Sequence, residues 1–170
     1  MSNYQGAIDD YEKALQNDPN IPLAYYNIAI AKIGLLDFKG AIVAFNIELS
    51  MHYKTKEIWY GRGVAKLGML DYRGAVDDFD EALRISFKFY EAHANKGIAL
   101  YLLDDLSGAY SAFEGSIATG PYHAKGWFGR GITKIALGEI ISGYEDLHAA
   151  SKLGYKQANE LLKGFEKLKE

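Results

Sequence analysis

A regular repeat runs through this sequence and constrains its fold more than any other feature. The segments LDFKGAIVAFNIEL, LDYRGAVDDFDEAL and DDLSGAYSAFEGSI begin at Leu36, Leu70 and Asp104, which are equally spaced along the chain. Each segment has a glycine at its fifth position, and the same interval separates Gly6 from the first of these, Gly40. This 34-residue period lies within the range of about 20–50 residues that is the signature of a protein built from stacked structural units.

Three further positions keep their character from one repeat to the next. An acid or an asparagine comes first, a small residue follows four positions later, and a large apolar residue follows after four more. Residues at i and i+4 share one face of a helix, and an acid just before a helix can accept hydrogen bonds from its free N–H groups. The three series are Asn3, Asp37, Asp71, Asp105 and Glu139; Ala7, Ala41, Ala75, Ala109 and Gly143; and Tyr11, Phe45, Phe79, Phe113 and Leu147.

A second apolar segment precedes four of these helices, at residues 23–36, 58–70, 92–103 and 126–137. Every repeat is therefore predicted to contain two helices, A and then B, joined by a tight turn at the acidic position. The A segments carry a small residue at one phase, which lets the two backbones approach while the aromatic residue of helix B fills the space beside them. One such hairpin cannot bury its apolar faces alone, so a stack is expected. The small residues are Ala29, Gly63, Gly97 and Gly131.

Composition agrees with a helical protein and removes several classes of function. Of the 170 residues, 49% are hydrophobic and 24% charged, and only three are prolines, which argues against disorder. A net charge of −3 argues against nucleic acid or an anionic membrane as a partner, and the absence of cysteine excludes disulfides and thiolate chemistry. No apolar segment approaches the ~20 residues of a membrane span. No signal peptide is apparent, and a cytoplasmic location is expected.

The segment WYGRGVAKLGMLDYRGAVDDFDEAL, which begins at Trp59, resembles the tetratricopeptide repeat (TPR). The pattern of that family maps onto Trp59, Gly63, Ala75, Phe79 and Ala82. The segment GWFGRGITKIALG, from residue 126 onward, matches the first half of the pattern again. The resemblance covers nearly the whole chain and implies an all-α fold, a right-handed superhelical α-solenoid of antiparallel helix pairs. Departures include Glu48, which stands where the family has a small residue.

In this register the chain begins with a half repeat, helix B alone, at residues 1–21. Four complete repeats follow at 22–55, 56–89, 90–123 and 124–155, and residues 156–170 are expected to form a capping helix at the C-terminus. The apolar face of that last helix is predicted to consist of Ala158, Leu161, Leu162 and Phe165.

A second period, twice as long as the first, is superimposed on it. Arg62 and Asp78 in the second repeat correspond to Arg130 and Asp146 in the fourth, whereas the first and third repeats lack this combination. The simplest interpretation of this 68-residue period is an ion pair between helices A and B of the same repeat. The alternative is two unrelated solvated charges.

By the same resemblance, the A helices line the concave face of the stack, which is the expected site of binding. The residues directed there combine aromatic, aliphatic and amide side chains, which suit the apolar anchors and the backbone of a peptide. The aliphatic residues have an equally good interpretation as core. The predicted groove consists of Tyr26, Asn27 and Ile30; Tyr60 and Val64; Asn95, Ile98 and Tyr101; and Lys125, Phe128 and Ile132.

Two expectations refine this groove. Gly61 beside Tyr60, and Gly129 beside Phe128, are expected to leave pockets next to rigid aromatic walls. The clamp by which one TPR subclass grips the terminal carboxylate of chaperones is not supported. Its lysine and asparagine places are matched only by Asn95 and Lys125, while Tyr60, Val64 and Gly129 occupy the rest.

No arrangement of residues indicates catalysis. The histidines His52, His93, His123 and His148 lie at four different phases of the repeat, and no two are three or four positions apart, so no metal site is predicted. No nucleophile–base pair is evident, and no cofactor is expected. The sequence therefore predicts a non-enzymatic protein–protein interaction module that binds a peptide or helix of a partner protein in the groove. A third and more remote hypothesis is the scaffold part of an enzyme.

The alternative function is a structural scaffold that assembles with itself. Because helix A is missing from the first repeat, the apolar side chains of Ala7, Tyr11 and Leu15 are expected to face water unless something covers them. A homo-oligomer formed through this N-terminal helix would cover them.

Overall fold

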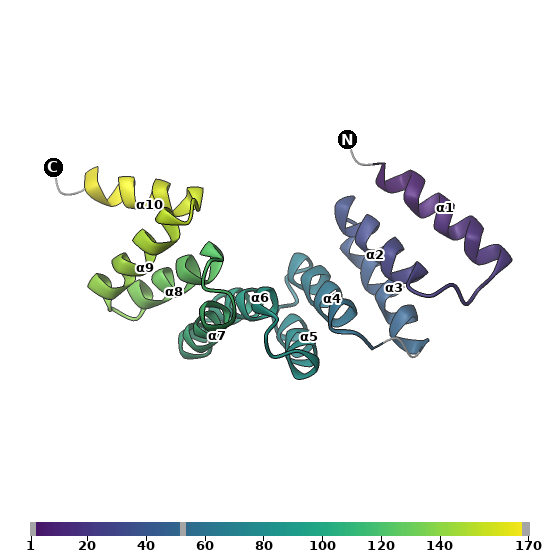
Figure 1. Ribbon diagram of the computed structural model, residues 1–170, viewed down its shortest axis with the longest axis horizontal. Coiled ribbons are helices and arrows are strands. Elements are labelled where there is room, and N and C mark those ends of the chain that lie inside the picture. Colours follow the sequence, from purple (N-terminus) through teal and green to yellow (C-terminus); the bar gives the residue numbers. More distant parts are fainter. Residues whose placement is uncertain (1–2, 52–53, 168–170) are drawn as a thin grey trace. The chain divides into compact units, whose positions relative to one another are not determined.

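The computed structural model describes residues 3–51 and 54–167, and within these residues the chain forms ten α-helices and no strand (Figure 1). The helices divide between two units, unit 1 (Met1–Ser86) with α1 to α5 and unit 2 (Phe87–Glu170) with α6 to α10. The helices of unit 1 are α1 (Tyr4–Asn17), α2 (Ala24–Gly34), α3 (Phe38–Ser50), α4 (Lys56–Gly68) and α5 (Tyr72–Ile85). Those of unit 2 are α6 (Tyr90–Leu102), α7 (Leu106–Thr119), α8 (Ala124–Ala136), α9 (Ile140–Lys152) and α10 (Lys156–Lys167).

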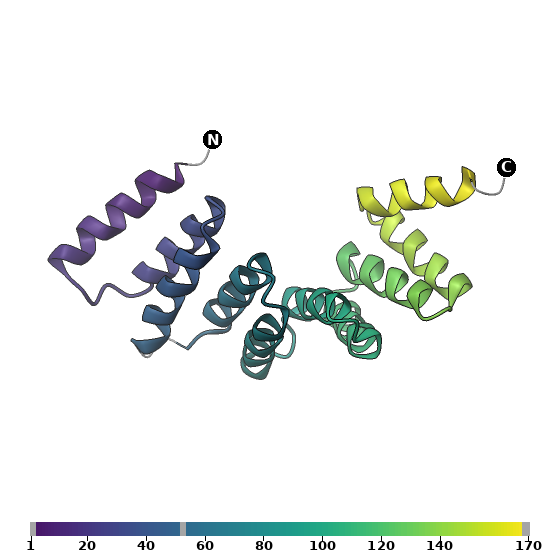
Figure 2. The ribbon, with the colours of Figure 1, turned by 180° about the vertical axis from the view of Figure 1, so that it is seen from behind.

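Both units are built from helix hairpins, as the 34-residue period predicts. Unit 1 contains the hairpins α2–α3 and α4–α5, preceded by α1, and unit 2 contains α6–α7 and α8–α9, followed by α10 (Figures 1 and 2). Within each unit every helix packs against the next one in the chain. The A helices of one unit also touch each other, α2 with α4 and α6 with α8. The architecture is an all-α helical repeat.

Four of the five B helices begin with the side-chain cap that the sequence predicts. The side-chain oxygens of Asn3, Asp37, Asp71 and Asp105 each accept a hydrogen bond of 2.9–3.0 Å from the backbone N–H of the repeated glycine three positions later. The capping group lies so close that a Cβ atom at Gly74 would be 2.3 Å from Oδ2 of Asp71. The glycine at this place therefore leaves room for the cap.

The fifth B helix is an exception to this prediction. Glu139 makes no side-chain cap for α9, and Ser142 stands where the other B helices have the glycine. The Ser142 hydroxyl instead donates to the carbonyl oxygen of Glu139 at 3.4 Å and to its Oε2 at 3.3 Å. Asparagine and aspartate are the preferred caps because their short side chains reach the first-turn N–H groups, whereas glutamate is longer and Ser142 occupies part of the space.

The turn between helices A and B places one residue in the left-handed backbone region. That residue is Leu36 (φ 61°), Leu70 (φ 63°), Asp104 (φ 63°) or Gly138 (φ 86°) in the four hairpins. Left-handed backbone costs a residue other than glycine roughly 1–2 kcal/mol. Packing of the hairpin, and not local preference, therefore fixes this turn in the first two hairpins, where the residue is leucine, whereas aspartate and glycine adopt this region more readily.

The small residue of helix A faces the large apolar residue of helix B, as predicted. A Cβ atom at Gly63 would lie 2.7 Å from the ring of Phe79, and one at Gly97 would lie 2.8 Å from the ring of Phe113. Phe45, Phe79 and Phe113 are at most 1% exposed. The two helices can approach this closely only because the A helix has no side chain at the point of contact.

Helix α1 packs on α2 even though it has no A helix of its own. Tyr11 and Leu15 lie against the buried cluster around Ile28 and Phe45, and the ring of Tyr4 covers Gly34. Ala7, Tyr11 and Leu15 are half-buried. The expectation that this apolar face is left to water is therefore corrected, because α2 covers part of it.

Helix α10 packs on α9 through its apolar side. Ala158 and Leu162 are buried, Leu161 is half-buried, and the ring of Phe165 lies 4.9 Å from that of Tyr144. The hydroxyl of Ser151 also donates to the side-chain amide oxygen of Asn159. The residues on the predicted apolar face of α10 therefore contact the rest of unit 2.

A pair of glycine substitutions tests the close approach at the cap. We expect Gly74→Ala to lower the free energy of unfolding by about 1 kcal/mol, because the new methyl group displaces the Asp71 cap. Gly164→Ala in α10 is the matched control, since a Cβ atom there meets nothing within 4 Å, and it should raise stability by up to about 1 kcal/mol. Urea unfolding followed by circular dichroism measures both. A stabilising Gly74→Ala would contradict this account of the glycine.

The aromatic residue of helix B is tested by truncation. Phe79→Ala should lower the free energy of unfolding by about 3–5 kcal/mol, because it leaves a cavity between α4 and α5. Tyr122→Ala serves as the control, since Tyr122 is 85% exposed, and it should leave the unfolding midpoint nearly unchanged. Equal unfolding curves for the two variants would show that the repeat register is wrong.

Candidate functional site

The predicted groove residues divide into two groups, one on the A helices of each unit. Because α2 touches α4 and α6 touches α8, each unit brings its own group together on two adjacent helices. We call the first group the α2–α4 face and the second the α6–α8 face. The α2–α4 face consists of Tyr26, Asn27, Ile30, Tyr60 and Val64, and the α6–α8 face of Asn95, Ile98, Tyr101, Lys125, Phe128 and Ile132.

On the α2–α4 face the helix α2 contributes an aromatic and an amide side chain. Tyr26 is half-buried, with its ring edge-on to Phe45 at 6.0 Å between centroids. Burial, and then the nearby charge of Glu57, raises the pKa of Tyr26. The Nδ2 atom of Asn27 donates to the carbonyl oxygen of Leu23 at 2.9 Å, which fixes the orientation of this amide. Ile30 is 41% exposed, so it lies at the surface and not in the core.

The helix α4 contributes Tyr60 and Val64, both half-buried. The ring of Tyr60 is tilted against that of Phe79, with centroids 5.9 Å apart. Tyr60 therefore rests on the core of its own hairpin and presents only part of its ring to the surface.

On the α6–α8 face two polar residues contact each other across the helices. Asn95 is only 6% exposed, and its Oδ1 atom accepts a hydrogen bond of 2.6 Å from Nζ of Lys125. Desolvation lowers the pKa of Lys125. The lysine and the amide thus form one polar group that links α6 and α8.

The remaining members of the α6–α8 face are apolar or aromatic. Ile98, Tyr101 and Ile132 are half-buried. Phe128 is half-buried as well, with its ring 4.9 Å from that of Tyr155 at the entrance to α10. This face therefore continues onto the residue that precedes the last helix.

The expected pockets beside Gly61 and Gly129 are absent. A Cβ atom at Gly61 would lie 2.4 Å from the ring of Phe45, and one at Gly129 would lie 2.2 Å from the ring of Phe113. The aromatic residue of the preceding B helix fills each space. The prediction was wrong because it considered the aromatic wall within one helix and not the ring that arrives from the hairpin before.

Glu48 has a role that sequence reasoning missed. Its side chain is 1% exposed and reaches from α3 to the start of α2, where Oε1 accepts from the N–H of Leu23 and Oε2 from the N–H of Tyr26, both at 3.1 Å. A carboxylate is stabilised at the N-terminus of a helix by free N–H groups and by the helix dipole. The departure from a small residue is therefore a cap supplied by the partner helix. The signal for this role in the sequence was an acidic residue at a position of the repeat that faces the core.

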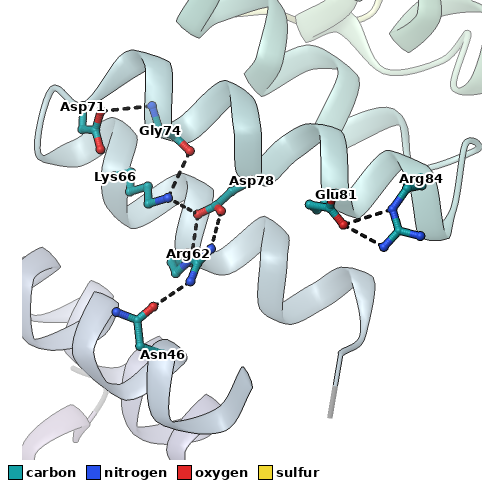
Figure 3. A network of polar contacts seen from close by, with 8 residues as sticks. All are labelled: Asn46, Arg62, Lys66, Asp71, Gly74, Asp78, Glu81 and Arg84. Atoms are coloured by element: carbon teal, nitrogen blue, oxygen red, sulfur yellow. Dashed lines mark hydrogen bonds and ion pairs between the residues drawn. The ribbon is translucent and has the colours of Figure 1, made fainter. Parts of the chain in front are cut away.

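The ion pair predicted from the 68-residue period is present in unit 1 (Figure 3). Arg62 binds Asp78 with two hydrogen bonds, Nε to Oδ2 at 2.8 Å and Nη2 to Oδ1 at 2.6 Å. Lys66 adds a second cation, with Nζ 2.9 Å from Oδ2 of Asp78, and donates to the carbonyl oxygen of Gly74. Nη1 of Arg62 also donates to Asn46 of α3 at 2.6 Å. The network joins the helices of one hairpin and reaches the hairpin before it.

Unit 2 contains the same network at the corresponding positions. Arg130 binds Asp146 with two hydrogen bonds of 2.8 and 2.9 Å, and Nζ of Lys134 lies 2.9 Å from the same carboxylate. The hydrogen bonds with Asp146 raise the pKa of Arg130. Oε1 of Glu114 in α7 lies 4.0 Å from Nη1 of Arg130. Glu114 is the residue of unit 2 that corresponds to Asn46 in unit 1. The interpretation of two unrelated solvated charges is therefore excluded.

A tryptophan lies over each arginine of the two networks. The guanidinium carbon of Arg62 is 4.7 Å from the ring centre of Trp59, and that of Arg130 is 5.1 Å from Trp127, which are cation–π distances. Nε1 of Trp127 donates to the carbonyl oxygen of Pro121 at 2.9 Å. The residue equivalent to Pro121 in unit 1 is residue 53, outside the described residues, and Nε1 of Trp59 is buried without a hydrogen-bond partner among the described residues.

The described residues offer no arrangement of side chains for metal binding. His93 is buried, with Nε2 2.9 Å from the carbonyl oxygen of Phe87, and His123 stacks on Tyr90 at 3.6 Å. His148 is exposed, and His52 lies outside the described residues. Over residues 3–51 and 54–167 no three histidine, aspartate or glutamate side chains gather in a group that could hold a metal ion. Within the same residues no helix is long and apolar enough to cross a membrane.

Comparison with known proteins identifies the fold. No protein-family model matches the sequence, and no curated protein matches it. Among solved structures, MamA from Desulfovibrio magneticus RS-1 matches with a TM-score of 0.84 and 17% identity, over 92% of this chain and 88% of that one. YrrB, a TPR protein with an unusual peptide-binding site, matches with a TM-score of 0.79 and 22% identity, over 94% and 84% of the two chains.

A third structure contains a bound peptide. The second TPR domain of human RPAP3, in complex with an HSP70 peptide, matches with a TM-score of 0.64 and 18% identity, over 66% of this chain and 94% of that one. At such identities the likeness establishes the fold and not the function. The fold is that of tetratricopeptide repeat proteins, as the sequence resemblance implied.

A double-mutant cycle tests the network of unit 1. Coupling between Arg62→Ala and Asp78→Ala should exceed about 1 kcal/mol, the upper end for exposed pairs, because the Asp78 side chain is 2% exposed and that of Arg62 17%. Arg84 and Glu81 of α5 provide the control cycle, since their pair is largely exposed, and they should couple less. Denaturant unfolding gives all the free energies. Additive effects of the Arg62 and Asp78 substitutions would contradict the structural role of the pair.

Proposed function

We propose that this chain is a non-enzymatic protein–protein interaction module that binds a peptide or helix of a partner protein on the α2–α4 face, the α6–α8 face, or both. The observation that carries the proposal is the composition of these faces. Each unit presents a half-buried aromatic ring and an oriented amide on two touching A helices, Tyr60 with Asn27 and Phe128 with Asn95. Rigid aromatic rings supply contact area at little cost in rotamer entropy.

The amides supply the polar part of recognition. The Asn27 side chain is held by the carbonyl oxygen of Leu23, and Asn95 is held by Lys125, so neither amide has to be ordered when a ligand binds. Reducing the cost of ordering side chains increases affinity. The structural neighbours support the same conclusion, since YrrB has an unusual peptide-binding site and the RPAP3 domain is bound to a peptide.

The two faces differ in charge and therefore in the ligand that suits each. The α2–α4 face has Glu57 close to Tyr26, and the α6–α8 face has Lys125 at the equivalent place, two repeats later. A peptide on the first face is expected to place a cation or a neutral donor near Glu57, and one on the second face an acceptor near Lys125. Because Lys125 is the only charged residue among those that define the two faces, and Glu57 lies beside the first, added salt should weaken binding only modestly.

Selection from a displayed library of random peptides on the immobilised chain provides ligands to measure. Tyr60→Ala should weaken the binding of peptides on the α2–α4 face by more than ~1 kcal/mol if its ring is a hot spot. Phe128→Ala should do the same for peptides on the α6–α8 face. Tyr122→Ala is the control, since its ring is exposed outside both faces, and it should leave affinity unchanged. Titration calorimetry gives the dissociation constants, corrected for the folded fraction by circular dichroism.

Two outcomes would contradict the proposal. Selected peptides that bind all three variants with equal affinity per folded molecule would place recognition elsewhere on the chain. Concentration-dependent association that is abolished by Tyr11→Glu, with no peptide retained, would instead favour the self-assembling scaffold as the function.

A further inference from the structure

A pocket of ≈ 360 Å³, open to solvent, lies in unit 1 between α1, α2 and α3. Its volume falls in the range of about 300–1,000 Å³ that is typical of ligand sites. Apolar side chains form most of the wall and polar ones stand at its edge. The apolar members are Leu15, Tyr25, Ile28, Val43, Ala44 and Ile47, and the polar ones are Glu12, Gln16 and Lys32.

The pocket occupies the place that the ion-pair network fills in the next hairpin. Ile28 and Ala44 stand one repeat before Arg62 and Asp78, so an aliphatic chain and a methyl group replace the guanidinium and its carboxylate. Lys32 keeps the position of Lys66, but its partner is Asp37 in the turn, at 3.4 Å. The α2–α3 hairpin therefore has an open pocket where the α4–α5 hairpin has the arginine–aspartate–lysine network.

The edge of the pocket on α3 is apolar, whereas the matching edge of the next hairpin, on α5, is charged. Val43 is 55% exposed and Ile47 is 37% exposed. Their counterparts on α5 are Asp77 and Glu81. Two exposed β-branched residues next to a mostly apolar pocket mark a site of interaction, because isolated apolar side chains are common at surfaces but adjacent ones are not.

The pocket is distinct from the face to which the proposed function refers. Helical residues advance by about 100° each, so Tyr25, Ile28 and Lys32 lie on the side of α2 opposite to Tyr26 and Ile30. A ligand in the pocket therefore leaves the α2–α4 face free.

We propose that the pocket is a second docking site, and that it takes an apolar side chain, such as leucine or methionine, from an amphipathic partner helix with basic residues beside this anchor. A helix fits because α1 and α3 form two walls with α2 as the floor, which is the arrangement of helix-in-groove recognition. The charge follows from α1, whose exposed Asp9 and Glu12 lie one turn apart on the same side of that helix. The lysine that lines the pocket, Lys32, is already paired with Asp37. Glu12 itself lines the pocket.

The probe is a synthetic amphipathic peptide of about 16 residues, long enough to form a helix on the protein, with leucine at helical spacing and lysine at the remaining positions. A matched peptide carries glutamate in place of lysine. Methyl NMR of the full chain reports which residues the peptide contacts, and fluorescence anisotropy gives the affinity. The lysine peptide is expected to shift the methyl signals of Val43, Ile47 and Ile28, and to bind at least several-fold more tightly than the glutamate peptide.

Two double variants remove the site in different ways. Ile28→Arg with Ala44→Asp fills the pocket with the side chains found in the next hairpin. Val43→Ser with Ile47→Gln removes the apolar edge on α3 without adding a charge that would itself attract the lysine peptide. Each is expected to weaken binding of the lysine peptide at least about tenfold. Tyr60→Ala, on α4 in the α2–α4 face, should not change the affinity of this peptide. The edge variant alters only exposed side chains, so it decides the question if the filled variant fails to fold.

Three results would overturn the proposal. The first is an edge variant that binds the lysine peptide with unchanged affinity and has the same circular dichroism spectrum as the unmodified protein. The second is equal affinity for the lysine and glutamate peptides, which would show that the site does not select basic residues in its partner. The third is loss of binding in Tyr60→Ala alone, which would assign the peptide to the α2–α4 face and support the proposed function without this second site.

Discussion

The fold depends on the close approach of an aromatic ring to helix backbones that carry no side chain at the point of contact. Phe113 shows this most clearly, because its ring lies against Gly97 of its own hairpin and also against Gly129 of the next A helix. Phe45 likewise meets Gly61 of the following hairpin. One buried ring therefore joins three helices, and the strength of the packing comes from dispersion contacts at the density of a protein interior.

Polar interactions then divide the hairpins into two alternating kinds. The first and third hairpins connect the end of helix B to the start of helix A, through Glu48 with its two N–H partners and through Ser116, whose hydroxyl donates to the carbonyl oxygen of Tyr90 at 3.0 Å. The second and fourth have alanine at that place, Ala82 and Ala150, and use the arginine–aspartate–lysine network instead. Each hairpin thus holds its helices together by one of two polar arrangements.

Most of the fold, and the part of the polar architecture that repeats, could be predicted from the sequence. The caps at Asp37, Asp71 and Asp105, and the Arg62–Asp78 pair, follow from short spacings within one repeat that recur along the chain. The failures involve partners from another helix or hairpin. The ring of Phe45 fills the space beside Gly61 from the preceding hairpin, and Glu48 caps the helix that precedes its own. Gly61 recurs as Gly129 with the 68-residue period, but this recurrence does not identify the ring that fills the space, and Glu48 has no second acid at its phase. The sequence therefore indicated these positions and not their partners.

The alternation has a consequence for how such a chain can change its length. Arg62 takes a hydrogen-bond partner, Asn46, from the helix before it, and Arg130 has Glu114 at the matching place. An insertion or deletion of one repeat would bring together hairpins of the same kind and leave these arginines beside a helix of the wrong type. A change of two repeats would keep the alternation of the two kinds of hairpin. A pair of hairpins, twice the length of the structural repeat, is therefore the shortest segment whose insertion or removal keeps each arginine beside a helix of the right kind.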